Sequence, residues 1–170
     1  MVKSKPLLII GACLALGLIG FFIFYQTDAE KIRSRLDDLA ERVSKEAPEN
    51  ELMAAGNAKK ISDLFTDPCV LEIPQTPYRD VSGEFSRQDI RAYAMSGRAR
   101  YENIELKFYD IMIDFPDEKT ADVRLTARVN ADASNRGQPF DEFYELACKF
   151  QKIEGDWYIN RVAAVEVLEK

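Results

Sequence analysis

The sequence contains no histidine, and this absence limits the chemistry that the chain can perform. It excludes acid–base catalysis by a histidine paired with a carboxylate. Only three cysteines occur, Cys13, Cys69 and Cys148, and none of them is paired at the spacing of a zinc site. The sequence also lacks a glycine-rich phosphate-binding loop and a nucleophile-elbow serine. We therefore expect neither a metal nor a cofactor.

The sequence also has fewer basic residues than acidic ones. The 170 residues include 23 Lys+Arg and 29 Asp+Glu, and without Lys3 and Lys5 the rest of the chain has 21 basic residues, a net charge of −8. Neutralising a phosphate backbone requires clustered lysine and arginine. The sequence therefore predicts no nucleic-acid partner.

Residues 6–25 form one uncharged, strongly apolar segment. Twenty residues of helix rise about 30 Å, which is the thickness of a bilayer's hydrocarbon core. The apolar part of a cleaved signal peptide is shorter, about 7 to 15 residues, and ends in small residues. The segment is therefore predicted to be a retained transmembrane helix, preceded by a tail of residues 1–5 and followed by one domain, residues 26–170.

The charged residues beside this segment suggest its orientation. Lys31 and Arg33 follow it closely, so a count of basic residues alone does not decide. Asp28 and Glu30 offset them, which leaves the N-terminal flank clearly positive. We expect a single-pass protein of the bacterial inner membrane, with a cytoplasmic tail and a periplasmic or extracytoplasmic domain.

Three helices are predicted in the first part of the domain. Apolar residues spaced by four, three and four predict a helix over residues 29–45, with a stripe of Ile32, Leu36, Leu39 and Val43. A second helix is expected over residues 50–65. Ser86 with Asp89 three residues later resembles a capping box, so a third helix should begin there and end near Gly97.

The remaining sequence predicts strands. A short strand is expected at residues 69–73, followed by an irregular connection up to residue 83. Beyond residue 97 the apolar period becomes two, which predicts four antiparallel strands. A change of phase at Tyr109–Asp110 predicts a β-bulge that curves the sheet. Along residues 122–129, apolar residues should face the core while the other face carries Arg124, Thr126 and Arg128.

Three stretches carry a resemblance to a known family. Residues 143–159, with the turn Gly155–Asp156–Trp157, resemble the paired closing strands of the nuclear transport factor 2-like superfamily, in particular its SnoaL-like branch. Residues 64–70 and 81–91 resemble earlier segments of the same fold. The resemblance implies an α+β cone of three helices packed on a curved antiparallel sheet. With residues 6–25 in front, the chain resembles uncharacterised single-span bacterial membrane proteins that carry this domain.

The resemblance implies two possible functions. The first is a non-catalytic interaction or scaffolding domain of a bacterial envelope assembly, because such domains often associate through the outer face of the sheet. Arg124, Thr126 and Arg128 would then contact a second copy of the chain or another envelope protein.

The second possibility is a binder of a small apolar ligand, or an isomerase, cyclase or lyase, that uses the interior of the cone. Its candidate residues are Asp110, Tyr109, Glu142 and Tyr144, since a proton-transfer site without histidine needs a carboxylate and a tyrosine. Acidic residues at alternating positions of a strand usually face water, however. We therefore favour the interaction domain over the enzyme.

Two further groups of residues allow alternatives. Outside the cytoplasm, Cys69 and Cys148 could form a disulfide, but the implied fold separates their strands and favours two buried thiols. A run of arginines around the third helix is expected to be a solvated face, or else a docking site for an acidic partner. Its members are Arg87, Arg91, Arg98 and Arg100.

Overall fold

The computed structural model describes residues 27–46, 49–76, 79–133 and 139–165. Within these ranges the chain forms three helices and six strands. In chain order they are α2 (Asp28–Val43), α3 (Glu51–Ser62), β1 (Phe65–Thr76), β2 (Arg79–Phe85), α4 (Arg87–Arg100), β3 (Tyr101–Asp114), β4 (Thr120–Ala133), β5 (Phe140–Ile153) and β6 (Asp156–Ala164).

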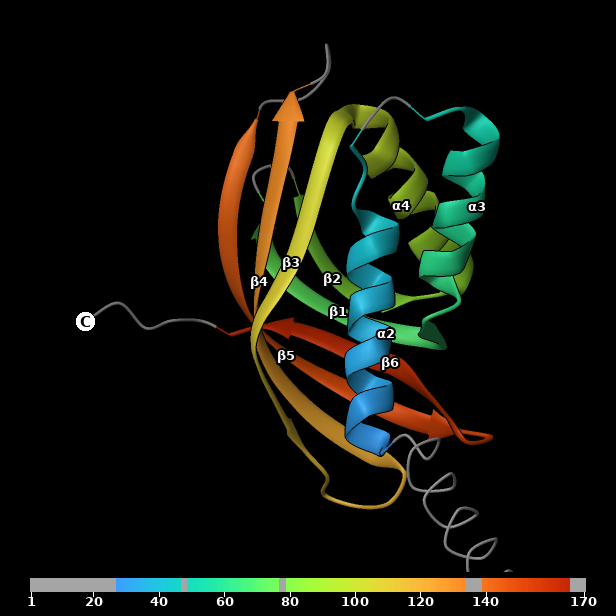
Figure 1. Cartoon of the computed structure of the whole chain (residues 1–170), viewed down its shortest axis with the longest axis vertical. Coiled ribbons are helices and arrows are strands. Elements are labelled where there is room, and N and C mark those ends of the chain that lie inside the picture. The colour runs from blue at the N-terminus through green and yellow to red at the C-terminus, as the bar shows by residue number, and fades with distance from the viewer. Residues whose placement is uncertain (1–26, 47–48, 77–78, 134–138, 166–170) are drawn as a thin grey trace, which may run out of the picture.

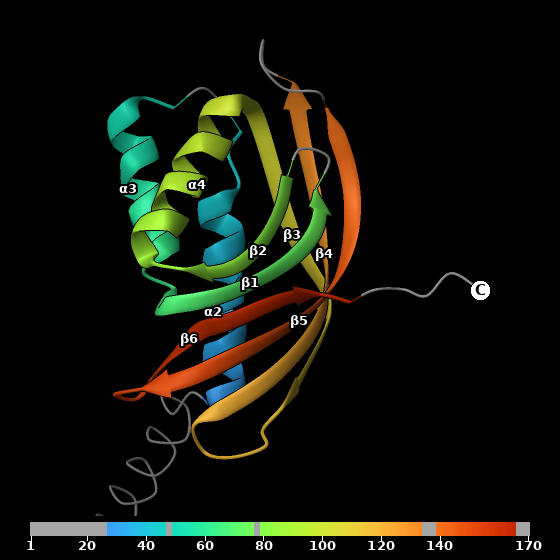
Figure 2. The ribbon, with the colours of Figure 1, turned by 180° about the vertical axis from the view of Figure 1, so that it is seen from behind.

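The strands form one curved sheet with the helices on one side of it (Figure 1). The strand order is β2-β1-β6-β5-β4-β3, and seen from behind, β2, β1 and β6 follow one another across the sheet (Figure 2). β1 runs parallel to β6, whereas every other neighbouring pair is antiparallel. The sheet is therefore mixed, and the prediction of an antiparallel sheet was wrong on this point.

β2 was also missed, because residues 77–83 were predicted to be an irregular connection. Instead β2 forms a hairpin with β1, in which Val70 lies opposite Glu84 and Leu71 lies opposite Gly83. Pro74 and Pro77 suggested a break in the strand. The hairpin accommodates this region with a register shift between Ile73 and Thr76.

The three predicted helices are confirmed, with different ends. Ser86 and Asp89 form the predicted capping box, and Thr27 and Glu30 form a second one at the start of α2. α3 ends at Ser62 instead of residue 65, and α4 continues to Arg100, beyond Gly97.

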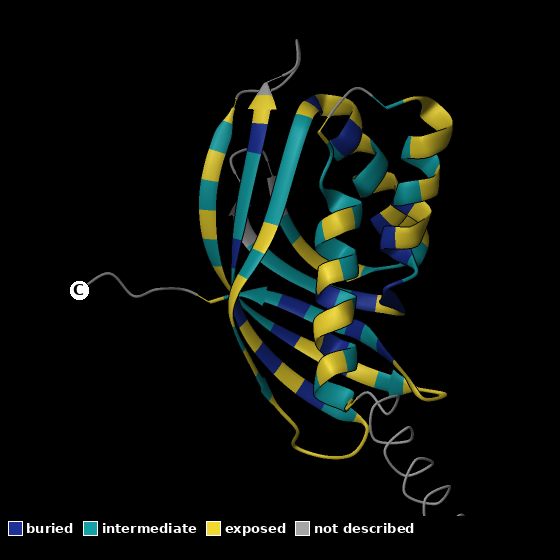
Figure 3. Cartoon of the chain, viewed as in Figure 1, coloured by how far each residue is buried: buried dark blue, intermediate teal, exposed yellow. Residues whose placement is uncertain are grey.

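The apolar stripe of α2 is used in two ways. Ile32 and Leu36, near its start, are 0% and 1% exposed and belong to the core, with Phe150, Trp157 and Ile159 from the sheet. Burying a side chain of this size contributes about 2 kcal/mol. Leu39 and Val43, nearer the end of α2, are only partly buried. Figure 3 shows the same division, with fully buried residues concentrated where the lower half of α2 crosses the sheet.

The curvature of the sheet has a local cause in β3. The register between β3 and β4 shifts between Tyr109 and Met112, and Asp110 has a φ of 53°. This irregularity is the β-bulge predicted at Tyr109–Asp110, and a bulge bends its strand. Beyond it, the sheet turns around the helices (Figure 1).

The first turn of α2 is attached to the hairpin that joins β5 and β6. The Asp28 carboxylate accepts hydrogen bonds from Lys152 Nζ at 2.8 and 2.9 Å and from Trp157 Nε1 at 3.0 Å. These donors, Lys152 first, lower the pKa of Asp28 below its ordinary value. The start of the domain is thus held against the sheet.

Within the described ranges, no helix has the length and apolar character needed to cross a membrane. The predicted transmembrane segment, residues 6–25, lies outside those ranges. The anchor, its orientation and the division of the chain at residue 26 therefore stay predictions.

Candidate functional site

The cone contains an apolar cavity of about 440 Å³ that is open to solvent. Its walls come from the second half of α2, from α3 and α4, and from the inner face of β1, β3, β4, β5 and β6. The lining includes six aromatic residues and twelve aliphatic ones, and the aromatic residues are Phe65, Tyr93, Tyr101, Phe108, Phe140 and Tyr144. Tyrosine hydroxyls are the only polar side-chain groups among these lining residues.

The cavity lies beside the second half of α2. Ile32 and Leu36 fill the space between them at one end, whereas Leu39 and Val43 line the cavity at the other. On β3, Leu106 and Phe108 contribute to the wall before the bulge turns the strand. The end of the helical stripe and the part of β3 before the bulge thus both contribute to the cavity wall.

Two of the four candidate site residues lie together at this cavity. Tyr144 is a lining residue, and its hydroxyl donates a hydrogen bond to Glu142 Oε2. Glu142 lies between Phe140 and Tyr144 on the same face of β5, and both of these neighbours line the cavity. Burial and the Glu142 carboxylate raise the pKa of Tyr144 well above its ordinary value, so the phenol is neutral at pH 7.

The other two candidates lie elsewhere. Asp110 is exposed at the bulge, and Tyr109 is 41% exposed on the outer face of the sheet, opposite Thr126. Neither lines the cavity. The structure thus brings Glu142 and Tyr144 together and places Asp110 and Tyr109 apart from them. A catalytic role of any of the four stays a prediction.

The proposed interface residues share the outer face of β4, as predicted. Val123, Leu125 and Ala127 are at most 4% exposed, while the side chains between them point away from the core. Arg128 forms a bidentate ion pair with the Asp141 carboxylate, in which Nε donates to Oδ1 at 2.8 Å and Nη2 donates to Oδ2 at 2.7 Å. Arg124 is exposed and Thr126 is half-buried.

Large apolar side chains surround these polar residues. Phe143 is 64% exposed and Met112 is 61% exposed, and Arg128 lies over the Phe143 ring at 5.7 Å from its centre. Phe143 lies opposite Arg128, and Met112 lies opposite Arg124. The outer face is therefore a mixed apolar and charged surface.

The two described cysteines are free and buried. β6 lies between the strand of Cys69 and the strand of Cys148, which confirms the expected separation. Burial raises the pKa of each thiol to about 12, so both are protonated at neutral pH. Elsewhere in the described ranges, no three His, Cys, Asp or Glu side chains gather where they could hold a metal ion.

Sequence reasoning missed most of the cavity wall. Tyr101 and Phe108 come from β3 and Phe140 comes from β5, and only the strand order brings residues of these two strands to one wall. The alternation along β5 was a usable signal, because it places Glu142 and Tyr144 on the face of Phe140.

Neither a protein-family model nor a curated protein sequence matches the chain. Solved structures do match. A candidate scytalone dehydratase from Novosphingobium aromaticivorans superimposes with a TM-score of 0.64 at 13% identity, over 83% of this chain and 85% of that one. A candidate aromatic ring hydroxylase from the same organism superimposes with a TM-score of 0.65 at 13% identity, over 85% of this chain and 94% of that one.

A third match is a candidate association domain of calcium/calmodulin-dependent protein kinase II from Xanthomonas campestris. Its TM-score is 0.61 at 17% identity, over 85% of this chain and 91% of that one. Identities this low establish a shared fold and leave activity open. The chain adopts the α+β cone fold of nuclear transport factor 2-like and SnoaL-like proteins.

Proposed function

We propose that the protein binds a small, largely apolar molecule inside the cone. The observation that carries this proposal is the cavity of about 440 Å³ whose eighteen lining residues offer only tyrosine hydroxyls as polar side-chain groups. Ligand sites typically have about 300 to 1,000 Å³ and a few placed polar groups in an apolar wall. A well-packed core leaves few voids larger than a water molecule.

The Tyr144–Glu142 pair supplies the polar recognition. Glu142 accepts the phenolic hydrogen, so the Tyr144 oxygen keeps a lone pair for a donor on the ligand. We therefore propose a ligand with an aromatic or aliphatic body and one hydroxyl group. Should the protein be an enzyme, the same pair would exchange the proton, because Glu142 is the carboxylate nearest to the cavity-lining hydroxyl.

The structural neighbours support this use of the fold. Two of them are named as candidate enzymes, a scytalone dehydratase and an aromatic ring hydroxylase. Nothing in the cavity of this chain requires catalysis, so binding is the narrower proposal.

The proposal can be tested in two steps on the full-length protein. Native mass spectrometry after gentle release from detergent would detect a discrete extra mass if a ligand is already present. For empty protein, isothermal titration calorimetry with 2-naphthol, using detergent alone as the blank, should show one saturable site. Tyr144→Phe should weaken binding between about threefold and tenfold, the value of one neutral hydrogen bond.

Tyr158→Phe serves as the matched control, since Tyr158 does not line the cavity. It should bind 2-naphthol as the unmodified protein does. Absence of both a resident mass and saturable naphthol binding would contradict the proposal.

We propose an interaction role as a second candidate. The exposed Phe143 and Met112 beside Arg124 and Arg128 favour it, because aromatic, methionine and arginine side chains are enriched at protein interfaces. One neighbour is named as an association domain. The partner would be a second copy of the chain or another envelope protein.

A further inference from the structure

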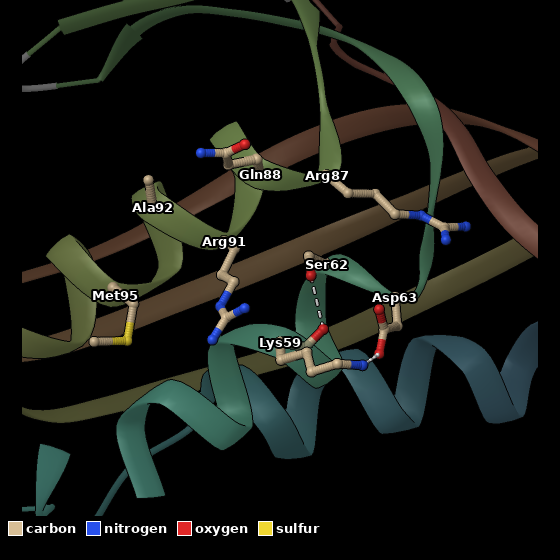
Figure 4. A pocket seen from close by; sticks show the side chains of 8 residues that line it. All are labelled: Lys59, Ser62, Asp63, Arg87, Gln88, Arg91, Ala92 and Met95. Carbon is tan, nitrogen blue, oxygen red and sulfur yellow. Dashed lines mark hydrogen bonds and ion pairs between the residues drawn. The ribbon is translucent and has the colours of Figure 1, made fainter. Parts of the chain in front are cut away.

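A second hollow lies on the opposite side of the helical layer, between α3 and α4 (Figure 4). It has a volume of about 570 Å³ and shares no lining residue with the cone cavity. We call it the α3–α4 groove. It is lined by Lys59, Ser62, Asp63, Arg87, Gln88, Arg91, Ala92 and Met95.

The charge of the α3–α4 groove is opposite to that of the chain. Its lining has three cationic side chains and one carboxylate, although the whole chain carries a net charge of −6. The single carboxylate, Asp63, is paired with Lys59 at 2.7 Å. No carboxylate among the groove residues therefore forms an ion pair with Arg87 or Arg91.

Arg87 is held in place by the fold. Its Nε donates to the Phe65 carbonyl oxygen at 2.8 Å, and its guanidinium carbon lies 5.6 Å from the centre of the Tyr158 ring. A side chain that is already ordered loses little conformational freedom when a ligand arrives. Its positive charge is thus fixed at one wall of the groove.

Arg91 is the cationic side chain that is available to bind an anion. It is exposed, and in the described part of the chain no hydrogen bond or ion pair occupies its guanidinium. Figure 4 shows it extending from α4 toward α3, on the side of Lys59. A guanidinium with five donors suits the paired oxygens of a carboxylate or phosphate group.

The groove continues into an apolar section along α4. Ala92 and Met95 follow Arg91 by one and four residues and complete the lining at that end (Figure 4). A ligand that fills both parts would need an anionic group next to a short apolar body.

We propose that the α3–α4 groove is a binding site for a small organic anion. Its phosphate or carboxylate group binds Arg91, with Arg87 and Lys59 adding positive potential, and its apolar part covers Ala92 and Met95. The source is a free molecule, because the acidic domain is repelled by an anionic membrane surface. The groove is separate from the cone cavity, so this site does not depend on the function proposed above.

The test uses butyl phosphate as the probe, added to full-length protein in a zwitterionic detergent. Proton–carbon NMR spectra should show saturable shifts of the Ala92 and Met95 methyl signals, while the Leu106 and Val129 methyl signals of the cavity stay in place. Arg91→Gln should weaken binding about tenfold or more, the value of a charge-assisted hydrogen bond.

Arg33→Gln is the matched control, since Arg33 is an exposed arginine on α2 that does not line the groove. It should leave the affinity unchanged. Inorganic phosphate should bind more weakly than butyl phosphate, and equal affinities would overturn the apolar part of the proposal. No saturable shift in the groove, or equal effects of both substitutions, would overturn the site.

Discussion

Arg98 of α4 and Glu49, just before α3, form a buried ion pair that closes one end of the helical layer. Arg98 is 4% exposed, and its Nε donates to Glu49 Oε2 at 2.7 Å. The same guanidinium donates to the carbonyl oxygens of Arg42 and Val43 at the end of α2. One side chain thus connects all three helices, although the sequence suggested a solvated arginine.

Replacing Arg98 by methionine should destabilise the protein by about 3 kcal/mol, because it removes the charged partner of the partly buried Glu49 carboxylate and the donor to two carbonyl groups. Chemical denaturation measures the change. Arg91→Met, on the same helix but exposed, should cost less than about 0.5 kcal/mol. Equal losses in the two variants would show that Arg98 does not connect the helices.

Stability should decrease in acid through the Glu49 carboxyl. The hydrogen bond from Arg98 is the main cause that holds the pKa of Glu49 below its ordinary value of 4.5. Because the folded pKa is the lower one, this stabilisation is present above about pH 4.5 and is lost as the pH falls through the folded pKa. Glu49→Gln should therefore make the free energy of unfolding depend less on pH between about pH 5 and pH 3.

Filling the cone cavity should prevent binding without unfolding the domain. Val129→Phe adds a ring at a lining position, so the affinity for 2-naphthol should fall at least about tenfold while thermal stability is kept. Val165→Phe adds the same ring at a position that is 44% exposed and should bind normally. Unchanged binding by Val129→Phe would place the ligand outside the cavity.

Self-association through the outer face of the sheet should depend on charge. Arg124→Glu combined with Arg128→Glu should shift a dimer to monomer in sedimentation velocity, since it reverses the charge of the proposed contact face and removes the ion pair of Arg128 with Asp141. Lys60→Glu with Arg91→Glu makes the same change of charge on the helical side. An oligomer that survives the first pair would exclude this contact, and Phe143→Ser gives an independent check of the same face.

The buried thiols should be unreactive in the folded protein. With a pKa of about 12 and no exposed sulfur, Cys69 and Cys148 should react with a thiol reagent at pH 8 only after denaturation. A Cys13→Ser variant removes the remaining cysteine from the assay. Two thiols should then be counted in denaturant under non-reducing conditions, and a count of zero would indicate a disulfide.

The sequence was informative where one physical pattern decides the structure. The stripe beginning at Ile32, the capping box at Ser86 and the change of phase at Tyr109 depend on neighbours in the chain, and each predicted its element correctly. β2 was missed because its stability comes from pairing with β1, which local prolines concealed.

The site was less predictable, for the same reason. The alternation along β5 groups Glu142 with Tyr144, but only the tertiary fold shows that this face lines a cavity while Asp110 does not. Arg98 and Arg91 are similar in sequence context, yet one is buried and the other exposed, because the partner of Arg98 comes from a segment 49 residues away.

The connection of Asp28 to Lys152 has a consequence for where the cavity lies in an anchored chain. It fixes the first turn of α2 against the sheet, whereas Leu39 and Val43 border the cavity eleven or more residues later, about 16 Å or more along the helix. In a chain anchored through residues 6–25, the anchored end of the domain and this part of the cavity wall would therefore lie at opposite ends of α2.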